Sequence, residues 1–146
     1  MSNVKTLLSG KSTELWSVSP ENSVLDAIKM MSEKNVGALT VMLNDELVGI
    51  ISERDYTRKV ILKERASSST KVKEIMSKQV YYTHPEQSID ECMILMTEHR
   101  IRHLPVLENK KLIGMISVGD VVKAIINDQK YTIKQLENYI SWEENY

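Results

Sequence analysis

The sequence predicts a mixed α/β protein built from two copies of one unit, and two observations support this prediction. First, the segment GIISERD at residues 49–55 returns 65 residues later, in a gapless alignment, as GMISVGD at residues 114–120. Second, short apolar runs alternate with segments whose apolar residues recur at helical spacing. Both copies read Gly, two apolar residues, Ser, two variable residues and Asp. We expect the glycine at the turn into a buried strand, and Ser and Asp at the start of the following helix.

Size and composition limit the architecture and the partners. One copy alone, of about 60 residues, would bury only a marginal core, so the two copies should pack on each other. The chain has 146 residues and no Phe, which predicts an aliphatic, Met-rich core. A net charge of −1 gives no electrostatic reason to expect nucleic acid as the main partner. The single cysteine, Cys92, excludes an internal disulfide and a metal site made of paired cysteines.

The first copy predicts its elements from local patterns. Ser23 and Asp26 resemble a capping box that opens a helix, and Asn35 with Gly37 favours its end. Asn44 and the residue after it form a hairpin turn. In chain order we expect a short helix near 4–8, a strand entering Trp16, a helix from 24, strands at 38–43 and 47–51, and a helix opened by Asp55.

The second copy predicts the same order. Ser88 and Glu91 form its capping box, and Asn109 marks its hairpin. We expect a short helix at 72–76, strands at 80–83, 104–107 and 112–116, and helices from 89 and over 121–126. The serine-rich segment between the copies lacks periodicity. The predicted domains are therefore 4–64 for the first repeat, 65–72 for a linker, 73–127 for the second repeat and 128–146 for a C-terminal amphipathic helix.

The C-terminal segment has no counterpart in the first copy. Thr132 and Gln135 form a third capping pattern, and Ile133, Leu136 and Ile140 lie on one helical face. An amphipathic helix must bury that face. Two interpretations remain open: the helix packs on its own domain, or it forms an oligomer contact.

The repeated corner also has two interpretations. A helix start offers unpaired N–H groups and partial positive charge, which attract phosphate, whereas a carboxylate placed there repels phosphate and accepts hydrogen bonds from a diol such as ribose. Ser52 with Asp55, and Ser117 with Asp120, therefore suit a cradle for ribose and phosphate. The same residue types are also ordinary helix caps.

Positive charge differs between the copies. Arg102 and His103 precede the buried strand of the second copy, where both surface solvation and phosphate binding are reasonable interpretations. Gly37 and Ala38 stand at the matching positions of the first copy, which instead has Arg54 inside its corner. If there are two clefts, they are unequal.

The repeated Gly-apolar-apolar-Ser-x-x-Asp corner, the RHLPV strand at 102–106 and the SERDY segment at 52–56 resemble tandem cystathionine-beta-synthase (CBS) type domains of the stand-alone bacterial kind. The resemblance covers residues 4 to about 127. It implies a β-α-β-β-α unit used twice about a pseudo-two-fold axis, called a Bateman module. Such modules commonly form homodimers and bind AMP, ADP, ATP, NADH or S-adenosylmethionine between the repeats.

The resemblance implies two clefts. In one cleft, Ser117 and Asp120 hold ribose. Arg102 and His103 hold the phosphates of that ligand. The backbone near Thr13, Leu15, Gly37 and Ala38 surrounds its base. The other cleft uses Ser52 and Asp55 for ribose, Arg54 for phosphate, and backbone from Lys78 to Val80 for adenine.

No catalytic apparatus is visible, because the histidines have no metal-ligand spacing and no Gly-rich phosphate loop occurs. We therefore expect no enzyme, no metal and no catalytic cofactor, but an adenine-nucleotide sensor that acts through an unknown effector protein. The alternatives are a structural interaction module with empty clefts and a nucleic-acid-binding protein. The N-terminus lacks signal-peptide features and no apolar run approaches membrane-spanning length, so we expect a cytoplasmic protein without a membrane partner.

Overall fold

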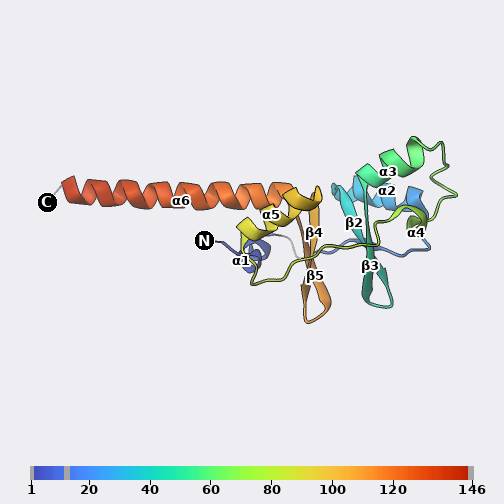
Figure 1. The fold of residues 1–146 in the computed structure, drawn as a ribbon, viewed down its shortest axis with the longest axis horizontal. Helices are drawn as coiled ribbons and strands as arrows, with labels where there is room; N and C mark the ends of the chain where they lie inside the picture. The colour runs from blue at the N-terminus through green and yellow to red at the C-terminus, as the bar shows by residue number, and fades with distance from the viewer. Residues whose placement is uncertain (1, 12–13, 145–146) are drawn as a thin grey trace. The chain divides into compact units, whose positions relative to one another are not determined.

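The computed structural model describes residues 2–11 and 14–144 and is a mixed α/β structure, as predicted (Figure 1). Thr13, expected near the base of a bound nucleotide, lies outside the described residues. The elements in chain order are α1 (Val4–Ser9), β1 (Ser17–Val18), α2 (Val24–Lys34), β2 (Ala38–Leu43), β3 (Glu46–Ser52), α3 (Glu53–Tyr56), the π-helical turn η1 (Thr57–Ile61), α4 (Val72–Ile75), α5 (Ile89–His99), β4 (His103–Glu108), β5 (Lys111–Ser117) and α6 (Val118–Glu144).

The strands form two small sheets. One has the order β1-β2-β3, with β1 parallel and β3 antiparallel to β2, and the other consists of β4 and β5. The hairpin turns predicted at Asn44 and Asn109 are confirmed, since each asparagine has a positive φ of 51° and the next residue also has a positive φ. The strand predicted at 80–83 is wrong. Only Thr83 forms a bridge there, parallel to Val106.

The capping predictions for the two longer repeat helices are confirmed at their first turns. Ser23 Oγ accepts a hydrogen bond from the Asp26 N–H at 3.1 Å, and Ser88 Oγ accepts one from the Glu91 N–H at the same distance. Asn35 ends α2 in the left-handed conformation, with φ of 54°. The two helices therefore begin in the same way in both repeats.

The chain divides into two compact units, each containing one repeat corner. Residues 14–82 and 109–113 form the first-repeat unit, and residues 2–11, 83–108 and 114–144 form the second-repeat unit. Helix α1 lies at the start of the first repeat but belongs to the second-repeat unit, whereas α4 lies at the start of the second repeat but belongs to the first-repeat unit. Divisions of the sequence into repeats and of the structure into units therefore differ.

Matching backbone hydrogen bonds attach these two short helices. In the second-repeat unit, the Val4 N–H donates to the carbonyl of Gln87 at 2.9 Å. In the first-repeat unit, the Val72 N–H donates to the carbonyl of Asn22 at 2.8 Å. Gln87 and Asn22 are equivalent in the repeat alignment. The backbone hydrogen bond that attaches the short helix, α1 or α4, is therefore duplicated along with the repeat.

The repeated glycines provide room for these helices. Gly49 and Gly114 lie inside β3 and β5, so the expectation that they form the turn into the strand is wrong. A Cβ atom at Gly49 would lie 2.7 Å from Met76 Sδ, and one at Gly114 would lie 2.8 Å from Leu8 Cδ2. Each glycine thus allows a side chain at the end of α4 or α1 to touch the strand backbone.

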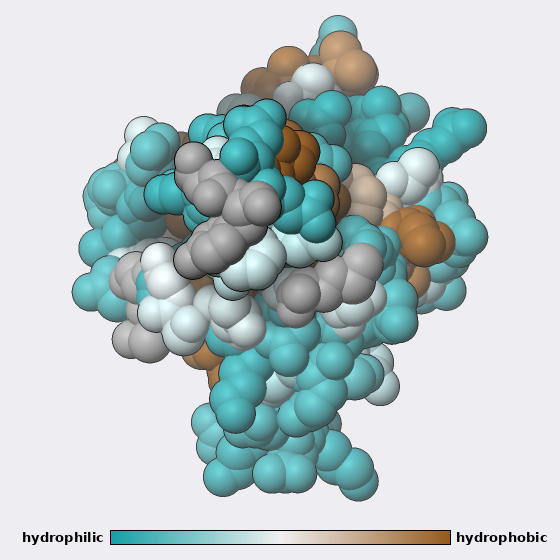
Figure 2. All heavy atoms as spheres, turned by 90° about the vertical axis from the view of Figure 1, so that its left-hand side faces the viewer, coloured by the Kyte–Doolittle hydropathy of each residue, from teal (hydrophilic) through white to brown (hydrophobic). Residues whose placement is uncertain are grey.

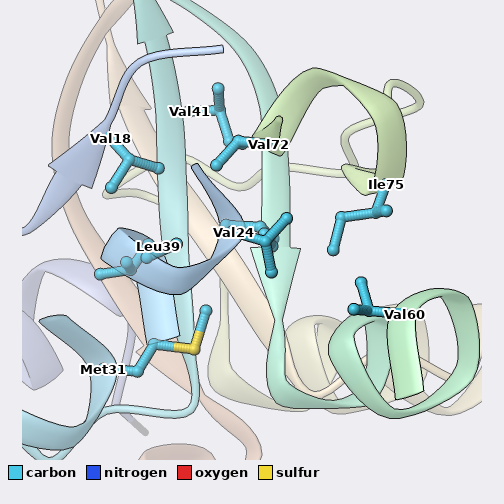
Figure 3. Close-up of a cluster of buried hydrophobic side chains, with 10 residues drawn as sticks. Val18, Val24, Met31, Leu39, Val41, Val60, Val72 and Ile75 are labelled. Carbon is cyan, nitrogen blue, oxygen red and sulfur yellow. The ribbon is translucent and has the colours of Figure 1, made fainter. Parts of the chain in front are cut away.

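An aliphatic core, as predicted, fills the first-repeat unit. Figure 3 shows Val72 and Ile75 of α4 directed into the cluster formed by Val24, Val60 and their neighbours. Val72 is 0% exposed and Ile75 is 1% exposed. Burial of these side chains fixes α4 against the repeat that precedes it.

The C-terminal segment continues the last repeat helix. Helix α6 runs unbroken over 27 residues, so the separate helix predicted to start at Thr132 is wrong. The Thr132 hydroxyl donates to the carbonyl of Asp128 at 3.1 Å, which is the bond of a mid-helix threonine. Asp128 also accepts two hydrogen bonds from Ser2, at 3.0 Å from N–H and 2.6 Å from Oγ. The N-terminal segment is therefore fastened to α6.

Replacement of Gly49 tests the close contact with α4. Gly49→Ala should lower the free energy of unfolding by about 1–3 kcal/mol, because the new methyl group would meet Met76 and the carbonyl oxygen of Ser77. Gly119→Ala is the matched control: its nearest neighbour would be Ser117 Oγ at 3.6 Å, and it should raise stability by about 0.4–1 kcal/mol. Urea unfolding measures both changes. Equal effects of the two variants would contradict this account.

Candidate functional site: two capped helix corners

The two corners have the same capping geometry. Ser117 Oγ accepts from the Asp120 N–H at 3.1 Å, and the Ser117 N–H donates to Asp120 Oδ2 at 2.8 Å. At the first corner the corresponding distances between Ser52 and Asp55 are 3.2 and 3.0 Å. The capping interpretation is therefore confirmed at both corners. It leaves room for a second role at Asp120, because Oδ1 accepts no hydrogen bond within the described residues.

A backbone hydrogen bond joins each corner to the residue before the preceding strand. The Val118 N–H donates to the carbonyl of Arg102 at 2.8 Å, and the Glu53 N–H donates to the carbonyl of Gly37 at 3.1 Å. The hairpin thus brings Arg102 to the corner, as the sequence predicted. Gly37, which has no side chain, occupies the equivalent place in the first-repeat unit, and the residue after it is Ala38.

His103 is half-buried beside the second corner. Its burial lowers the pKa of the imidazole, and the positive charges of Lys11 and Arg102 lower it further, while Asp120 opposes them. At neutral pH the ring is therefore mainly uncharged, so one ring nitrogen can donate a hydrogen bond and the other can accept one. A negatively charged group brought near it would raise its pKa.

Lys11 is the site residue that sequence reasoning missed. Its Nζ donates to Asp120 Oδ2 at 2.5 Å and to the carbonyl of Met115 at 2.8 Å. Burial raises the pKa of Asp120, but the hydrogen bonds from Lys11 and from the Ser117 backbone outweigh it, so the pKa lies below its usual value. The GKS sequence at 10–12 is typical of a turn and does not indicate a site. Because Lys11 is 109 positions from Asp120 and lies in the other repeat, no local pattern indicates the pair.

A cavity of about 540 Å³ opens at this corner within the second-repeat unit. Its polar lining comes from α1, α6 and the N-terminal segment, namely from Ser2, Thr6, Lys11, Asp120, Lys123 and Asn127. Two ammonium groups, two hydroxyls and an amide therefore surround one carboxylate. Hydroxyl, amide and ammonium groups at this spacing suit a ligand that carries both hydroxyl groups and negative charge.

The first corner is arranged differently. Asp55 Oδ1 forms an ion pair with Lys59 Nζ at 3.1 Å, one turn further along the same helical segment. Arg54 is exposed. A cavity of about 550 Å³ in this unit is lined by α2 and by Gly37, Glu53 and Tyr56, but Asp55 is not part of its lining.

The remaining predicted residues divide between the units. Ser77 pairs with Ile50 by two backbone hydrogen bonds of 2.9 and 3.1 Å, which places the segment leading to Lys78 and Val80 beside β3. Leu15, Gly37 and Ala38 belong to the first-repeat unit, whereas Ser117 and Asp120 belong to the other. Their grouping in a single cleft stays a prediction.

No group of three or more His, Cys, Asp or Glu side chains among the described residues is arranged to hold a metal ion. None of the helices described there is both long and apolar enough to cross a membrane.

The duplicated unit, with a capped Ser-x-x-Asp corner in each copy, defines a protein with tandem α/β domains. Residues 5–61 and 72–127 both match the model of the CBS domain. The chain therefore belongs to the CBS domain family, which confirms the resemblance found in the sequence.

Individual relatives agree with this assignment. The chain is 44% identical over 139 residues to the mitochondrial CBS domain-containing protein CBSX3 of Arabidopsis thaliana, covering 90% of this chain and 67% of that protein. It is 53% identical to the structure of a candidate signal-transduction protein with CBS domains from Burkholderia ambifaria, with a TM-score of 0.85, covering 88% of this chain and 96% of the other.

A more distant structure shares the fold. The CBS domain pair of protein MJ0100, solved in complex with 5'-methylthioadenosine and S-adenosylmethionine, is 22% identical to this chain with a TM-score of 0.77. The match covers 87% of this chain and 98% of that one. At this identity the likeness concerns the fold alone.

Loss of the Lys11 ammonium should raise the pKa of Asp120. A carboxyl group whose pKa is lower in the folded state stabilises that state above the unfolded pKa of about 3.9, and this contribution disappears as the pH falls through the folded pKa. Lys11→Met should therefore lower stability at neutral pH, and its difference from wild type should shrink as the pH falls from about 5 towards 3.

Carbon-detected NMR titration of the Asp120 carboxyl measures the shift directly, and urea unfolding at several pH values measures its effect. Lys123→Met is the control, because Lys123 lines the same cavity but forms no ion pair within the described residues. An unchanged Asp120 pKa in Lys11→Met would refute the interaction.

Proposed function

We propose that this chain is a non-catalytic regulatory module that binds an adenine nucleotide, namely AMP, ADP, ATP or NADH. The observation that carries the proposal is the Asp120 corner. There a half-buried carboxylate, whose Oδ1 accepts no hydrogen bond within the described residues, lines a polar cavity together with Lys11 and Lys123, and its charge acts on the imidazole of His103. A carboxylate at a helix start accepts hydrogen bonds from a ribose diol. The adenosine ligands of the distant relative MJ0100 support the same ligand class.

Ligand binding requires a rearrangement of charge at Asp120. Lys11 forms an ion pair with this carboxylate. A ribose diol would compete for the carboxylate, and the released ammonium group would remain within reach of phosphates near Arg102 and His103. The proposed base contacts come from backbone near Thr13, Leu15, Gly37 and Ala38.

The two proposed sites are unequal. The second would use Ser52 and Asp55 for ribose, Arg54 for phosphate, and the backbone from Lys78 to Val80 for adenine. Asp55 already holds Lys59 from its own helical segment, and no cation stands at Gly37 or Ala38. We therefore expect the Asp120 site to bind phosphate-rich ligands more tightly than the Asp55 site.

The regulatory output would pass to a separate effector protein. A ligand changes the balance between two conformations only by its difference in affinity for them. Homodimerisation and a cytoplasmic location belong to the same proposal. A structural interaction module is the alternative, favoured by the exposed apolar side chains of α6. Nucleic-acid binding is disfavoured by the net charge of −1.

Charge removal at the two corners tests the site and its asymmetry together. Asp120→Asn keeps an oxygen for the Ser117 N–H but loses the charge-assisted ribose contact, so affinity for AMP or ATP should fall about 10- to 100-fold. Asp55→Asn, the matched control, should have a smaller effect. Isothermal titration calorimetry with AMP, ATP and NADH measures both. Equal affinities in wild type and Asp120→Asn would refute the proposed ribose contact.

The phosphate contact is tested by comparing ligands with and without phosphates. Arg102→Ala should weaken ATP binding about tenfold while leaving adenosine binding nearly unchanged, because only ATP offers anionic oxygens to the guanidinium group. Lys110→Ala, an exposed cation at the tip of the hairpin between β4 and β5, is the control. Equal losses of affinity for adenosine and for ATP would show that Arg102 does not act by binding phosphate.

A further inference from the structure

The distal part of α6 is an exposed helix with an apolar seam. Val121 is the last buried residue among those that the structure describes, and every described residue from 129 onward is exposed. The large apolar residues along one side of the helix have about half of their surface exposed to solvent: Val122 41%, Ile126 44%, Ile133 55%, Leu136 59% and Ile140 55%. The view towards the free end of the helix shows apolar surface beside hydrophilic side chains (Figure 2).

The spacing of the seam is that of a coiled coil. Together with Gln129, these residues follow one another at intervals of four, three, four, three and four positions. An alternation of three and four keeps a seam aligned with a partner helix over several turns. The three isoleucines recur every seven residues, and Gln129 is the polar member of the seam. The 19 residues from 122 to 140 extend over about 28 Å of helix.

The charges beside the seam distinguish the two possible orientations of a partner helix. Along one edge, lysine stands at 123 and 130 and glutamate at 137 and 144, seven residues apart in each step. Along the other edge, positions 125, 132 and 139 are Ile, Thr and Tyr, which carry no charge. A parallel pair of helices brings opposite edges together and would form no ion pairs here. An antiparallel pair brings like edges together.

We propose that this seam is a docking surface for a second copy of the same chain, with the two α6 helices antiparallel. One register places Lys130 opposite Glu137 of the second copy and Lys123 opposite Glu144 of the second copy. By symmetry both contacts occur twice. The same register brings Ile133 near Leu136 of the second copy and Ile140 near Gln129 of the second copy, so it covers the three apolar side chains of the distal half of the seam. The spacing and charges of the seam support this contact without reference to the proposed nucleotide binding.

Site-specific disulfide formation tests the orientation. In this register, position 129 faces position 140 of the second copy, whereas the two copies of position 140 lie about 16 Å apart along the axis, too far for a disulfide. A mixture of Gln129→Cys and Ile140→Cys full-length chains, one of them carrying a tag, should form the mixed disulfide under mild oxidation. Ile140→Cys alone should not form one.

The wild-type chain is the control, because its single cysteine, Cys92, is buried. Disulfide formation by Ile140→Cys alone would indicate a parallel pair and overturn the proposal. Absence of any cross-link would also overturn it and leave the seam to another partner. A disulfide reports the distance between two named positions. The test therefore gives the orientation of the two helices even if other surfaces of the chain also self-associate.

Charge exchange tests the register. Lys130→Glu and Glu137→Lys should each weaken self-association several-fold in sedimentation velocity, and the double variant Lys130→Glu/Glu137→Lys should restore it. Lys134→Glu makes the same charge change away from the seam and should have little effect. Failure of the double variant to recover, or equal weakening by Lys134→Glu, would refute the proposed pairing.

Discussion

The close contact between a strand glycine and the short helix from the start of the other repeat is the constraint on which both units depend. Leu8 of α1 reaches the place where Gly114 has no side chain, and Met76 of α4 does the same at Gly49. Helix α1 comes from the first repeat but makes its contact in the second-repeat unit. Helix α4 comes from the second repeat but makes its contact in the first-repeat unit. Neither repeat therefore completes its unit from its own contiguous sequence. This arrangement explains how units of marginal size obtain sufficient buried surface.

The same arrangement produces the difference between the two corners. Val4 and Val72 begin equivalent helices, so Gln79 stands at the position equivalent to Lys11. Asp120 receives a lysine from outside its repeat, whereas Asp55 receives Lys59 from its own helical segment. Identical Ser-x-x-Asp corners thus acquire different electrostatic surroundings. The asymmetry that the sequence suggested through Arg102 and His103 has a further source in the segment after α1.

Local patterns predicted what local physics determines. The helix caps, the hairpin turns and the aliphatic core follow from hydrogen bonding and burial within a few residues. The failures have non-local causes. Gly49 is explained only by Met76, and Lys11 is linked to Asp120 only through the fold. Thr132 was a poor guide because a threonine in a long helix bonds to the preceding turn as readily as it caps a new one.

Continuity of α6 gives the Asp120 corner a connection to the C-terminal segment. The helix begins at the corner, and the N-terminal segment holds it twice, through Lys11 at Asp120 and through Ser2 at Asp128. A ligand that took Asp120 from Lys11 would release the first of these contacts and leave the second. Such a ligand can then alter α6 only by as much as the stability of the Lys11 contact differs between the ligand-free and ligand-bound states. A change of occupancy at one carboxylate can therefore influence the helix that carries the exposed seam without any rearrangement of the core.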